Sequence, residues 1–317
     1  MTAALVAVVV LFAWNLGAHY TGATMGMPYA SRSISLWPAL AVVAAFSLLG
    51  AVFASGDVER TVGEHLVPAH DVQTATALVI VATAGALTML FNYLRLPTST
   101  IQILVFCVLG AAVAAHLRID WGTLGRLVLV WAAAPVGALL LGYAFTHGLD
   151  RVAPPAQRLL PLLLVAVGVC ASFAMGANDV ANATGALILV HVTSLRAAGA
   201  IGGAAMFVGA LTWGRRILDR VAFDVVRLDL SMASAAQGVQ ALVVILAVTQ
   251  GYFTSMNQAL IAAMAGTGVA RGRNTVDRKQ LEAIARGWLI GPAAGFGLAY
   301  AVELLARAAL GRRRVAW

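Results

Sequence analysis

The chain has 317 residues, 61% of them hydrophobic and 11% charged, with a mean hydropathy of +0.88. Soluble domains carry about 25% charged residues, so this composition excludes a soluble protein and predicts a multi-pass membrane protein. The net charge of +8 comes mostly from loop arginines. Because no basic run is interleaved with aromatic residues, we expect no nucleic-acid partner.

Apolar segments of about membrane-spanning length follow one another from end to end. In the first half they fall at 3–27, 36–55, 73–93, 99–116 and 123–146. In the second half they fall at 160–190, 197–213, 233–250, 256–270 and 283–306. This pattern predicts an all-α polytopic membrane protein, with membrane lipid around it and no soluble domain.

The two halves share an ordered set of matching residues, which indicates an internal repeat. Gly17-Ala18 matches Gly176-Ala177, Gly50-Ala51 matches Gly209-Ala210, and Trp131-x-x-x-Pro135 matches Trp288-x-x-x-Pro292. We therefore predict one transport domain made of two repeats, 1–150 and 151–317. About five segments per repeat is an odd number, so the second repeat would be inverted, as in many secondary transporters.

The loop charges predict an orientation in the membrane, because cytoplasmic loops are enriched in Lys and Arg. One side collects Arg32, Arg151, Arg158, Arg215, Arg216, Arg220, Arg227, Arg271, Arg273, Arg278 and Lys279. The other side holds Arg60, Arg118, Arg196 and the tail arginines 312–314. We expect the first side to be cytoplasmic, both termini to lie outside, and Trp213–Leu230 to form the main cytoplasmic loop.

A polar cluster interrupts the apolar run that begins near Leu160. The stretch from Met175 to Gly185 contains Asn178, Asp179, Asn182 and Thr184. An Asp at membrane depth costs roughly 2.5–3.5 kcal/mol even on the mildest scale. Asn178 and Asn182 share one helix face. The cluster is therefore either a buried set of polar residues with a structural role or a substrate and ion site.

Two helix breaks occupy matching positions in the halves. In Leu96-Pro97-Thr98-Ser99-Thr100-Ile101-Gln102, the proline and the hydroxyls predict that a new helix starts at Thr98 or Ser99. In Gly251-Tyr252-Phe253-Thr254-Ser255-Met256-Asn257-Gln258, the glycine supplies the break and Thr254 or Ser255 the cap. Helix N-termini hold anions without lysine or arginine. Thr98, Ser99, Thr100, Thr254 and Ser255 would thus suit a tetrahedral oxyanion, although ordinary caps of a re-entrant loop would look the same.

These residues resemble the inorganic phosphate transporter (PiT) family. Gly176-Ala177-Asn178-Asp179-Val180-Ala181-Asn182-Ala183 matches its signature, and Pro97-Thr98-Ser99-Thr100 is similar to its Pro-x-Ser-Thr-Thr-His loop. The resemblance covers essentially the whole chain. It implies an inverted-repeat symporter for an inorganic oxyanion, with a homodimer plausible, and nominates Asn178, Asp179, Asn182, Ser99, Thr100 and Ser255 as site residues.

The first half departs from the family pattern. His19-Tyr20 stands where the family has Asn-Asp, and the stretch continues as Met25-Gly26-Met27-Pro28-Tyr29, which is similar to the sulfate permease branch. The lost carboxylate puts sodium coupling in doubt, because hard sodium sites need oxygen ligands. Asp179 is the candidate ligand for Na⁺ or carrier for H⁺. His19 is a candidate proton site or a packing residue, and Tyr20 a candidate donor to the anion.

The prediction is a secondary active transporter that works by alternating access, with H⁺ or Na⁺ as coupling ion and no other cofactor. Sulfate is slightly favoured, because Tyr20 is a donor where the family has a carboxylate. Phosphate, which keeps a donor hydrogen, is the alternative if Asp179 faces the anion. An anion channel and a transport-dead membrane scaffold are less favoured. No enzyme is expected, since no catalytic pair accompanies Asp179.

Overall fold

The computed structural model describes residues 1–68, 72–94, 98–151, 157–224, 228–272, 275 and 278–315. The fold is all-α, as predicted. Its helices are α1 (Thr2–His19), α2 (Thr21–Ala30), α3 (Leu36–Ala54), α4 (Gly56–Arg60), the π-helix η1 (Thr61–His65), α5 (Thr74–Tyr93), α6 (Thr100–Ala114), α7 (Trp121–Asp150), α9 (Leu160–Asp179), α10 (Ala181–Leu189), α11 (Leu195–Asp224), α12 (Leu230–Thr249), α13 (Met256–Ala270) and α14 (Arg278–Val315).

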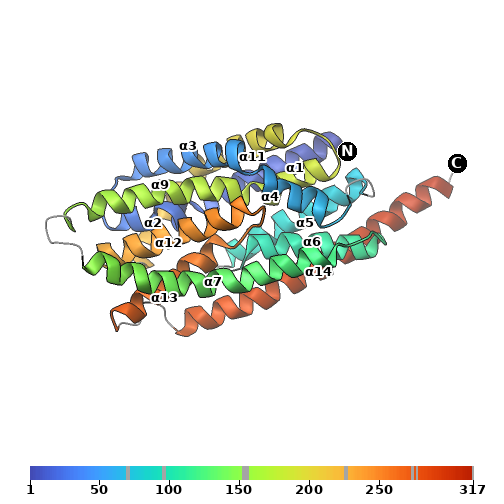
Figure 1. The fold of residues 1–317 in the computed structure, drawn as a ribbon. Helices are drawn as coiled ribbons and strands as arrows, with labels where there is room; N and C mark the ends of the chain where they lie inside the picture. The colour runs from blue at the N-terminus through green and yellow to red at the C-terminus, as the bar shows by residue number, and fades with distance from the viewer. Residues whose placement is uncertain are drawn as a thin grey trace.

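The helices form one elongated bundle, with long helices running between two ends (Figure 1). Within the described residues, eight helical spans are long and apolar enough to cross a membrane, and Thr100–Ala114 is a shorter apolar helix. In the α12 span 72% of the residues are buried, against 22% in the α7 and α14 spans. α12 is therefore central, while α7 and α14 are peripheral and expose large apolar side chains, as lipid-facing helices do.

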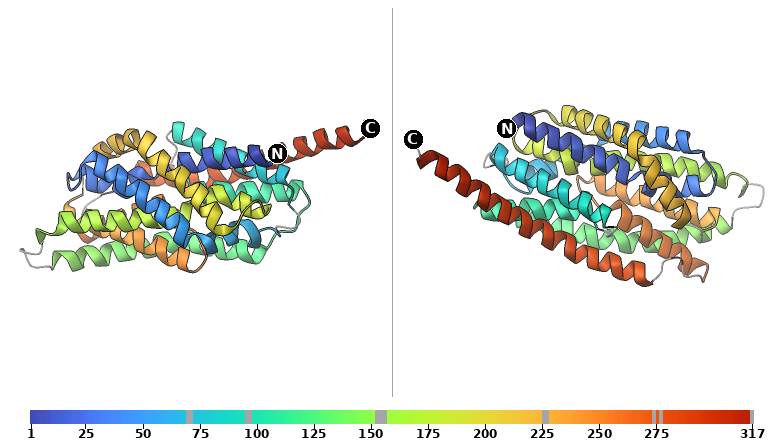
Figure 2. Two further views of the ribbon diagram at one scale, coloured as in Figure 1. Left: turned by 90° about the horizontal axis from the view of Figure 1, so that it is seen from above. Right: turned by 180° about the vertical axis from the view of Figure 1, so that it is seen from behind.

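The start of α1 and the end of α14 lie at the same end of the bundle (Figures 1 and 2). The start of α5 and the start of α7 lie at that end as well. The end of α7 and the start of α9 lie at the opposite end. This arrangement is the one that the loop-charge prediction requires, and the side facing the cytoplasm stays a prediction.

Two predicted loops are in part helical. Trp213–Leu230 was expected to be a cytoplasmic loop, but α11 continues through it to Asp224. A helix that leaves the bilayer no longer needs apolar residues, so hydropathy marks the span and not the helix end. The charged stretch after α3 contained no predicted segment, yet it forms α4 and η1.

Glycines allow the two halves to pack backbone against backbone. A Cβ atom on Gly17 would lie 2.1 Å from the carbonyl oxygen of Met206, and one on Gly176 would lie 1.9 Å from that of Ser47. The contacts also occur with the roles of the helices exchanged: a Cβ atom on Gly50 would lie against the carbonyl oxygen of Phe173, and one on Gly209 would lie against that of Trp14. Small residues permit such close approach between membrane helices. Each half thus meets the other through glycines at matching positions, and the inverted repeat itself stays a prediction.

Candidate functional site

Each half contains a helix pair that is interrupted near the centre of the bundle. α1 ends at His19 and α2 starts at Thr21, so that Tyr20 is the junction. α9 ends at Asp179 and α10 starts at Ala181. The first half thereby places a phenol at its break, and the second half places a carboxylate. Tyr20 and Asp179 are both fully or almost fully buried.

A hydrogen-bonded chain joins the two breaks. The hydroxyls of Tyr20 and Thr100 share a hydrogen bond of 2.7 Å. The Asn182 amide donates to the Thr100 hydroxyl and to Asp179 Oδ1, each at 3.3 Å. The start of α6 therefore connects the α1–α2 break to the α9–α10 break.

Asn178 ties the same region to the start of α13. Its Nδ2 donates to the Thr254 carbonyl at 2.9 Å, and its Oδ1 accepts from the Thr254 amide at 3.0 Å. Both partners are buried, and the pair closes a two-bond ring between a side chain and a backbone. Because a buried backbone group must be paired, this ring fixes where the second half-helix begins.

Both half-helices start within about one residue of the predicted positions: α6 begins at Thr100, where Thr98 or Ser99 was expected, and α13 begins at Met256. Ser99 caps α6 by accepting from the Gln102 amide at 3.4 Å, and Ser255 caps α13 by accepting from the Gln258 amide at 3.4 Å. Both starts read Ser-x-x-Gln, and in each only the serine side chain makes the capping bond, because the glutamine side-chain oxygens have no partner among the described residues. Thr98 is half-buried just before the first cap. Pro97, on which part of the prediction rested, lies outside the described residues.

Several buried polar atoms here have no partner among the described residues. They are Asp179 Oδ2, Asn182 Oδ1, Gln102 Oε1, Thr254 Oγ1 and both side-chain polar atoms of Gln258. Buried polar groups without partners cost about 1–3 kcal/mol each. An ion or a polar substrate at the site would satisfy them.

A polar stripe on α12 was not predicted from the sequence. It consists of Ser231, Ser234, Gln237 and Gln240, all buried. The Gln237 amide donates to the Ala23 carbonyl of α2 at 3.1 Å, and Gln240 donates to the Met256 carbonyl of α13 at 3.2 Å. The three-residue spacing, which makes each of these residues a neighbour of the next along the helix surface, was a signal that would have found them.

The remaining predicted residue, His19, is half-buried. Its ring packs edge-on against Tyr20, with ring centroids 4.7 Å apart. The structure therefore places His19 beside the hydrogen-bonded chain through Tyr20.

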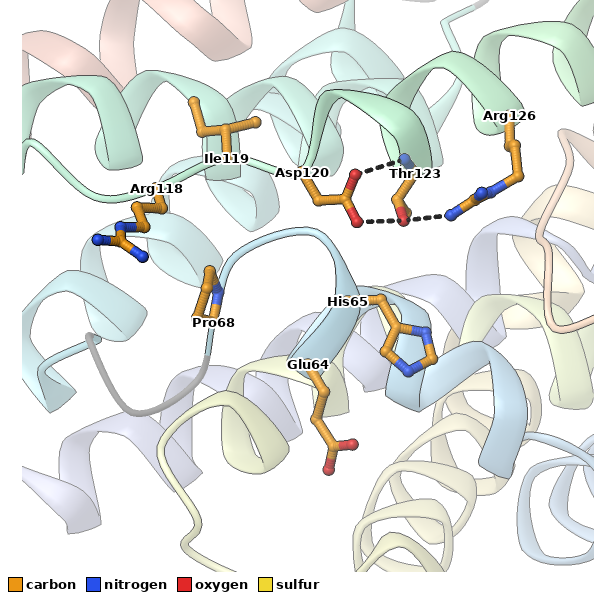
Figure 3. A pocket seen from close by; sticks show the side chains of 8 residues that line it. All are labelled: Glu64, His65, Pro68, Arg118, Ile119, Asp120, Thr123 and Arg126. Atoms are coloured by element: carbon orange, nitrogen blue, oxygen red, sulfur yellow. Dashed lines mark hydrogen bonds between the residues drawn. The ribbon is translucent and has the colours of Figure 1, made fainter.

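Two adjoining cavities form what we call the vestibule, at the end of the bundle where α7 begins. The first has a volume of about 570 Å³ and lies between η1 and the start of α7 (Figure 3). It mixes acidic and basic side chains, namely Glu64, His65, Arg118, Asp120 and Arg126. The second, of about 490 Å³, shares His65, Thr123 and Arg126 with the first and extends to Gly251 and Tyr252. The vestibule thus reaches the chain just before the α13 start.

The model of the phosphate transporter family matches residues 16–299 of this chain. The chain belongs to the phosphate transporter family. The sulfate permease CysP of Bacillus subtilis is 26% identical over 300 residues, which cover 91% of this chain and 83% of CysP. A solved structure of a protein named "The sodium-dependent phosphate transporter" matches with a TM-score of 0.88 at 19% identity, covering 97% of this chain and 100% of the other. The predicted family is therefore confirmed, and the fold is that of the solved structure.

Proposed function

We propose that this protein is an ion-coupled symporter that carries an inorganic tetrahedral oxyanion, with sulfate as the preferred substrate. The observation that carries this proposal is the convergence at one buried site of both helix breaks and both half-helix starts. Tyr20, Thr100, Asn182 and Asp179 form one hydrogen-bonded chain, and Asn178 holds the Thr254 backbone.

The anion would bind at the starts of α6 and α13. The first turn of a helix has free N–H groups and about half a positive charge. Ser99 and Ser255 already stabilise these turns as caps. Thr100, Thr254 and Tyr20 add hydroxyls that donate to an anion. Such a site neutralises an oxyanion without lysine or arginine.

The donor-rich first half favours sulfate. At neutral pH sulfate has no hydrogen to donate, so a site of donors satisfies every one of its oxygens. Tyr20 replaces the carboxylate that the family has at that position, and the similarity to the sulfate permease CysP points the same way.

Phosphate is the second candidate because of one specific atom. Asp179 Oδ2 has no partner among the described residues and would accept the hydrogen that phosphate keeps. The protein of the matching solved structure is also named as a transporter of phosphate that depends on sodium.

Asp179 would carry the coupling ion. It is fully buried at the end of α9, and its near neighbours are the amides of Asn178 and Asn182 and the phenol of Tyr20. An uncompensated carboxylate at this depth is costly, so binding of H⁺ or Na⁺ would be favourable. Coupling follows if this ion and the anion stabilise each other when both are bound at this site. His19 stays the second candidate for a proton role.

Alternating access would then expose this site first to the vestibule and later to the opposite end. From the loop charges we expect the vestibule and both termini to lie on the extracytoplasmic side. Uptake would begin there, through the cavity that ends at Gly251 and Tyr252.

The test is uptake of radiolabelled sulfate and phosphate into proteoliposomes that hold the purified full-length protein, with an imposed proton or sodium gradient. We expect concentrative sulfate uptake that collapses when the driving gradient is dissipated. Phosphate uptake driven by sodium would replace the sulfate proposal with the second candidate. Downhill flux that no gradient can concentrate would indicate a channel, and no flux of either anion would contradict transport.

A further inference from the structure

A second fully buried carboxylate lies outside the site. Glu59, on α4, has no exposed surface. Its Oε1 accepts a hydrogen bond of 2.6 Å from the hydroxyl of Thr184, on α10. Its Oε2 has no partner among the described residues. Thr184 belongs to the same polar motif as Asp179, so α4 is attached to the helix that begins at the site.

The charged groups on the helices around Glu59 leave it unneutralised. On α4, Asp57 and Arg60 are exposed and pair with each other at 3.4 Å. On η1 and at the start of α11, Glu64, His65 and Arg196 are exposed. α10 and α12 contain no titratable residue, and the acid of α9 is Asp179. Desolvation raises the pKa of Glu59 to about 7.

The Thr184 hydroxyl can serve both protonation states of Glu59. This hydroxyl lies 2.6 Å from Glu59 Oε1 and 3.0 Å from the carbonyl of Val180. When Glu59 is ionised, the hydroxyl donates to the carboxylate, at the short distance typical of a charge-assisted bond. When Glu59 is protonated, its own O–H donates to Thr184, which donates to Val180 instead. Both states keep their hydrogen bonds with little movement of heavy atoms.

Close packing holds this pair in place. A Cβ on Gly185 would lie 2.5 Å from Val62 Cγ1, and a Cβ on Gly202 would lie 2.5 Å from the methyl group of Thr184. The two glycines thus let η1 and α11 press against α10 and fix the rotamer of Thr184. η1 is a π-helical segment, a feature that is frequent at functional sites.

The opposite face of α4 borders the vestibule. Asp57, Arg60 and Thr61 line its second cavity together with Gly251 and Tyr252. The Thr61 hydroxyl donates to the Gly251 carbonyl at 2.6 Å, which links α4 and η1 to the segment before α13. Glu59 therefore lies on an element that touches the access route on one side and the α9–α10 break on the other.

The charge on the substrate indicates a function for such a group. Sulfate carries two negative charges, so symport with a single cation at Asp179 would move a net negative charge into a cell whose interior is negative. A second cation makes the cycle electroneutral. We infer that Glu59 is a second coupling site, which binds one proton from the vestibule side and releases it on the opposite side in each cycle. This inference rests on the proposed symport function.

The test uses the Glu59→Gln variant of the full-length protein in proteoliposomes, with the membrane potential clamped at zero. Each coupled proton multiplies the equilibrium accumulation of sulfate by about ten per unit of pH gradient. We expect Glu59→Gln to accumulate about tenfold less labelled sulfate than wild type at a gradient of one unit. Sulfate exchange at equal pH should stay near the wild-type rate, because glutamine resembles the protonated acid.

Glu303→Gln is the matched control. Glu303 is also a buried carboxylate that accepts from a threonine, Thr76, at 2.8 Å, but Arg307 neutralises it at 2.8 Å. Its variant should leave accumulation unchanged. Equal accumulation by wild type and Glu59→Gln would overturn the inference, as would a parallel loss of accumulation and exchange, which indicates a structural role. Wild-type protein that shows no sulfate exchange would instead overturn the proposed function.

Thr184→Val tests the hydrogen-bond switch separately. The variant removes the donor that stabilises the ionised form of Glu59, so proton release should require a higher pH and the pH profile of uptake should move upward. Thr146→Val, which removes another buried threonine bonded to its own helix at 2.8 Å, is the control. An unmoved profile in Thr184→Val would overturn the switch.

Thermal stability gives a readout that does not depend on transport. The pKa of Glu59 is raised in the folded state, so its contribution to stability is complete below pH 4.5 and is lost as pH rises to about 7. Between pH 5 and 8, the melting temperature of wild type should therefore fall by more than that of Glu59→Gln. Identical pH dependence of the two proteins would show that Glu59 does not titrate in this range.

Discussion

The two helix breaks of this protein follow one backbone plan and carry opposite chemistry. At the α1–α2 break, Tyr20 presents a hydroxyl that bonds Thr100 at 2.7 Å. At the α9–α10 break, Asp179 presents a carboxylate with one oxygen that has no partner among the described residues. The first break suits an anion and the second a cation. Two similar helix breaks can therefore favour ions of opposite charge when the residues at their junctions differ.

The largest effect is expected from removing the carboxylate of the second break. Asp179→Asn keeps the shape and one acceptor oxygen but cannot carry a proton or balance Na⁺. Coupling energies of 1–3 kcal/mol change the affinity of one ligand for a site by up to about 100-fold when the other is bound. Gradient-driven sulfate uptake should therefore fall on the order of 100-fold. Asp219→Asn, which changes an exposed carboxylate on α11 outside the vestibule, is the control. Wild-type rates for Asp179→Asn under every ion condition would remove Asp179 from coupling.

A smaller loss is expected when the second break loses its attachment to α13. Asn178→Ala leaves the amide and the carbonyl of Thr254 unpaired in a buried place, at about 1–3 kcal/mol each. Uptake should drop about tenfold or more, and the melting temperature in detergent should fall. Asn257→Ala, at a half-buried position on α13, should leave both values unchanged. A normal melting temperature with lost uptake would mean that Asn178 acts on the substrate directly.

Sequence alone predicted the parts of this comparison that depend on local rules. The caps at Ser99 and Ser255 were predicted because a serine before an apolar run is a local signal. The positions of the apolar segments followed from hydropathy. Asn178 and Asp179 were found because polar residues at membrane depth are rare.

The parts that sequence did not predict depend on tertiary contacts. Glu59 lies in a charged stretch that resembles a surface loop, and it is buried by the packing of α4 against α10 and other helices distant in sequence. Gln237 contacts Ala23, more than two hundred residues away. No local pattern predicts such a partner, although the polar stripe on α12 marks the face concerned.

Removing the phenol hydroxyl of the first break should have a moderate effect. Tyr20→Phe keeps the ring packed and deletes one hydrogen bond, which contributes about 0.5–1.5 kcal/mol. The half-saturating sulfate concentration should rise about 2- to 10-fold at an almost constant maximal rate. Tyr29→Phe, which removes, at the end of α2, a phenol hydrogen bond to Asp219, should leave this concentration unchanged. A reduced maximal rate with unchanged affinity would assign Tyr20 to conformational change and not to anion binding.

The smallest effect is expected at His19, the other residue that distinguishes the first break. His19→Phe keeps the edge-on contact with Tyr20, whose ring centroid lies 4.7 Å away, and removes the titratable imidazole. If protons travel through Asp179 and Glu59, sulfate uptake should change by less than about twofold, a difference below 0.5 kcal/mol. Its pH profile should match that of wild type. Uptake is measured from pH 5.5 to 8 in both proteins. A flattened profile in His19→Phe would assign proton coupling to the first break, and the division of chemistry between the two breaks would then be reversed.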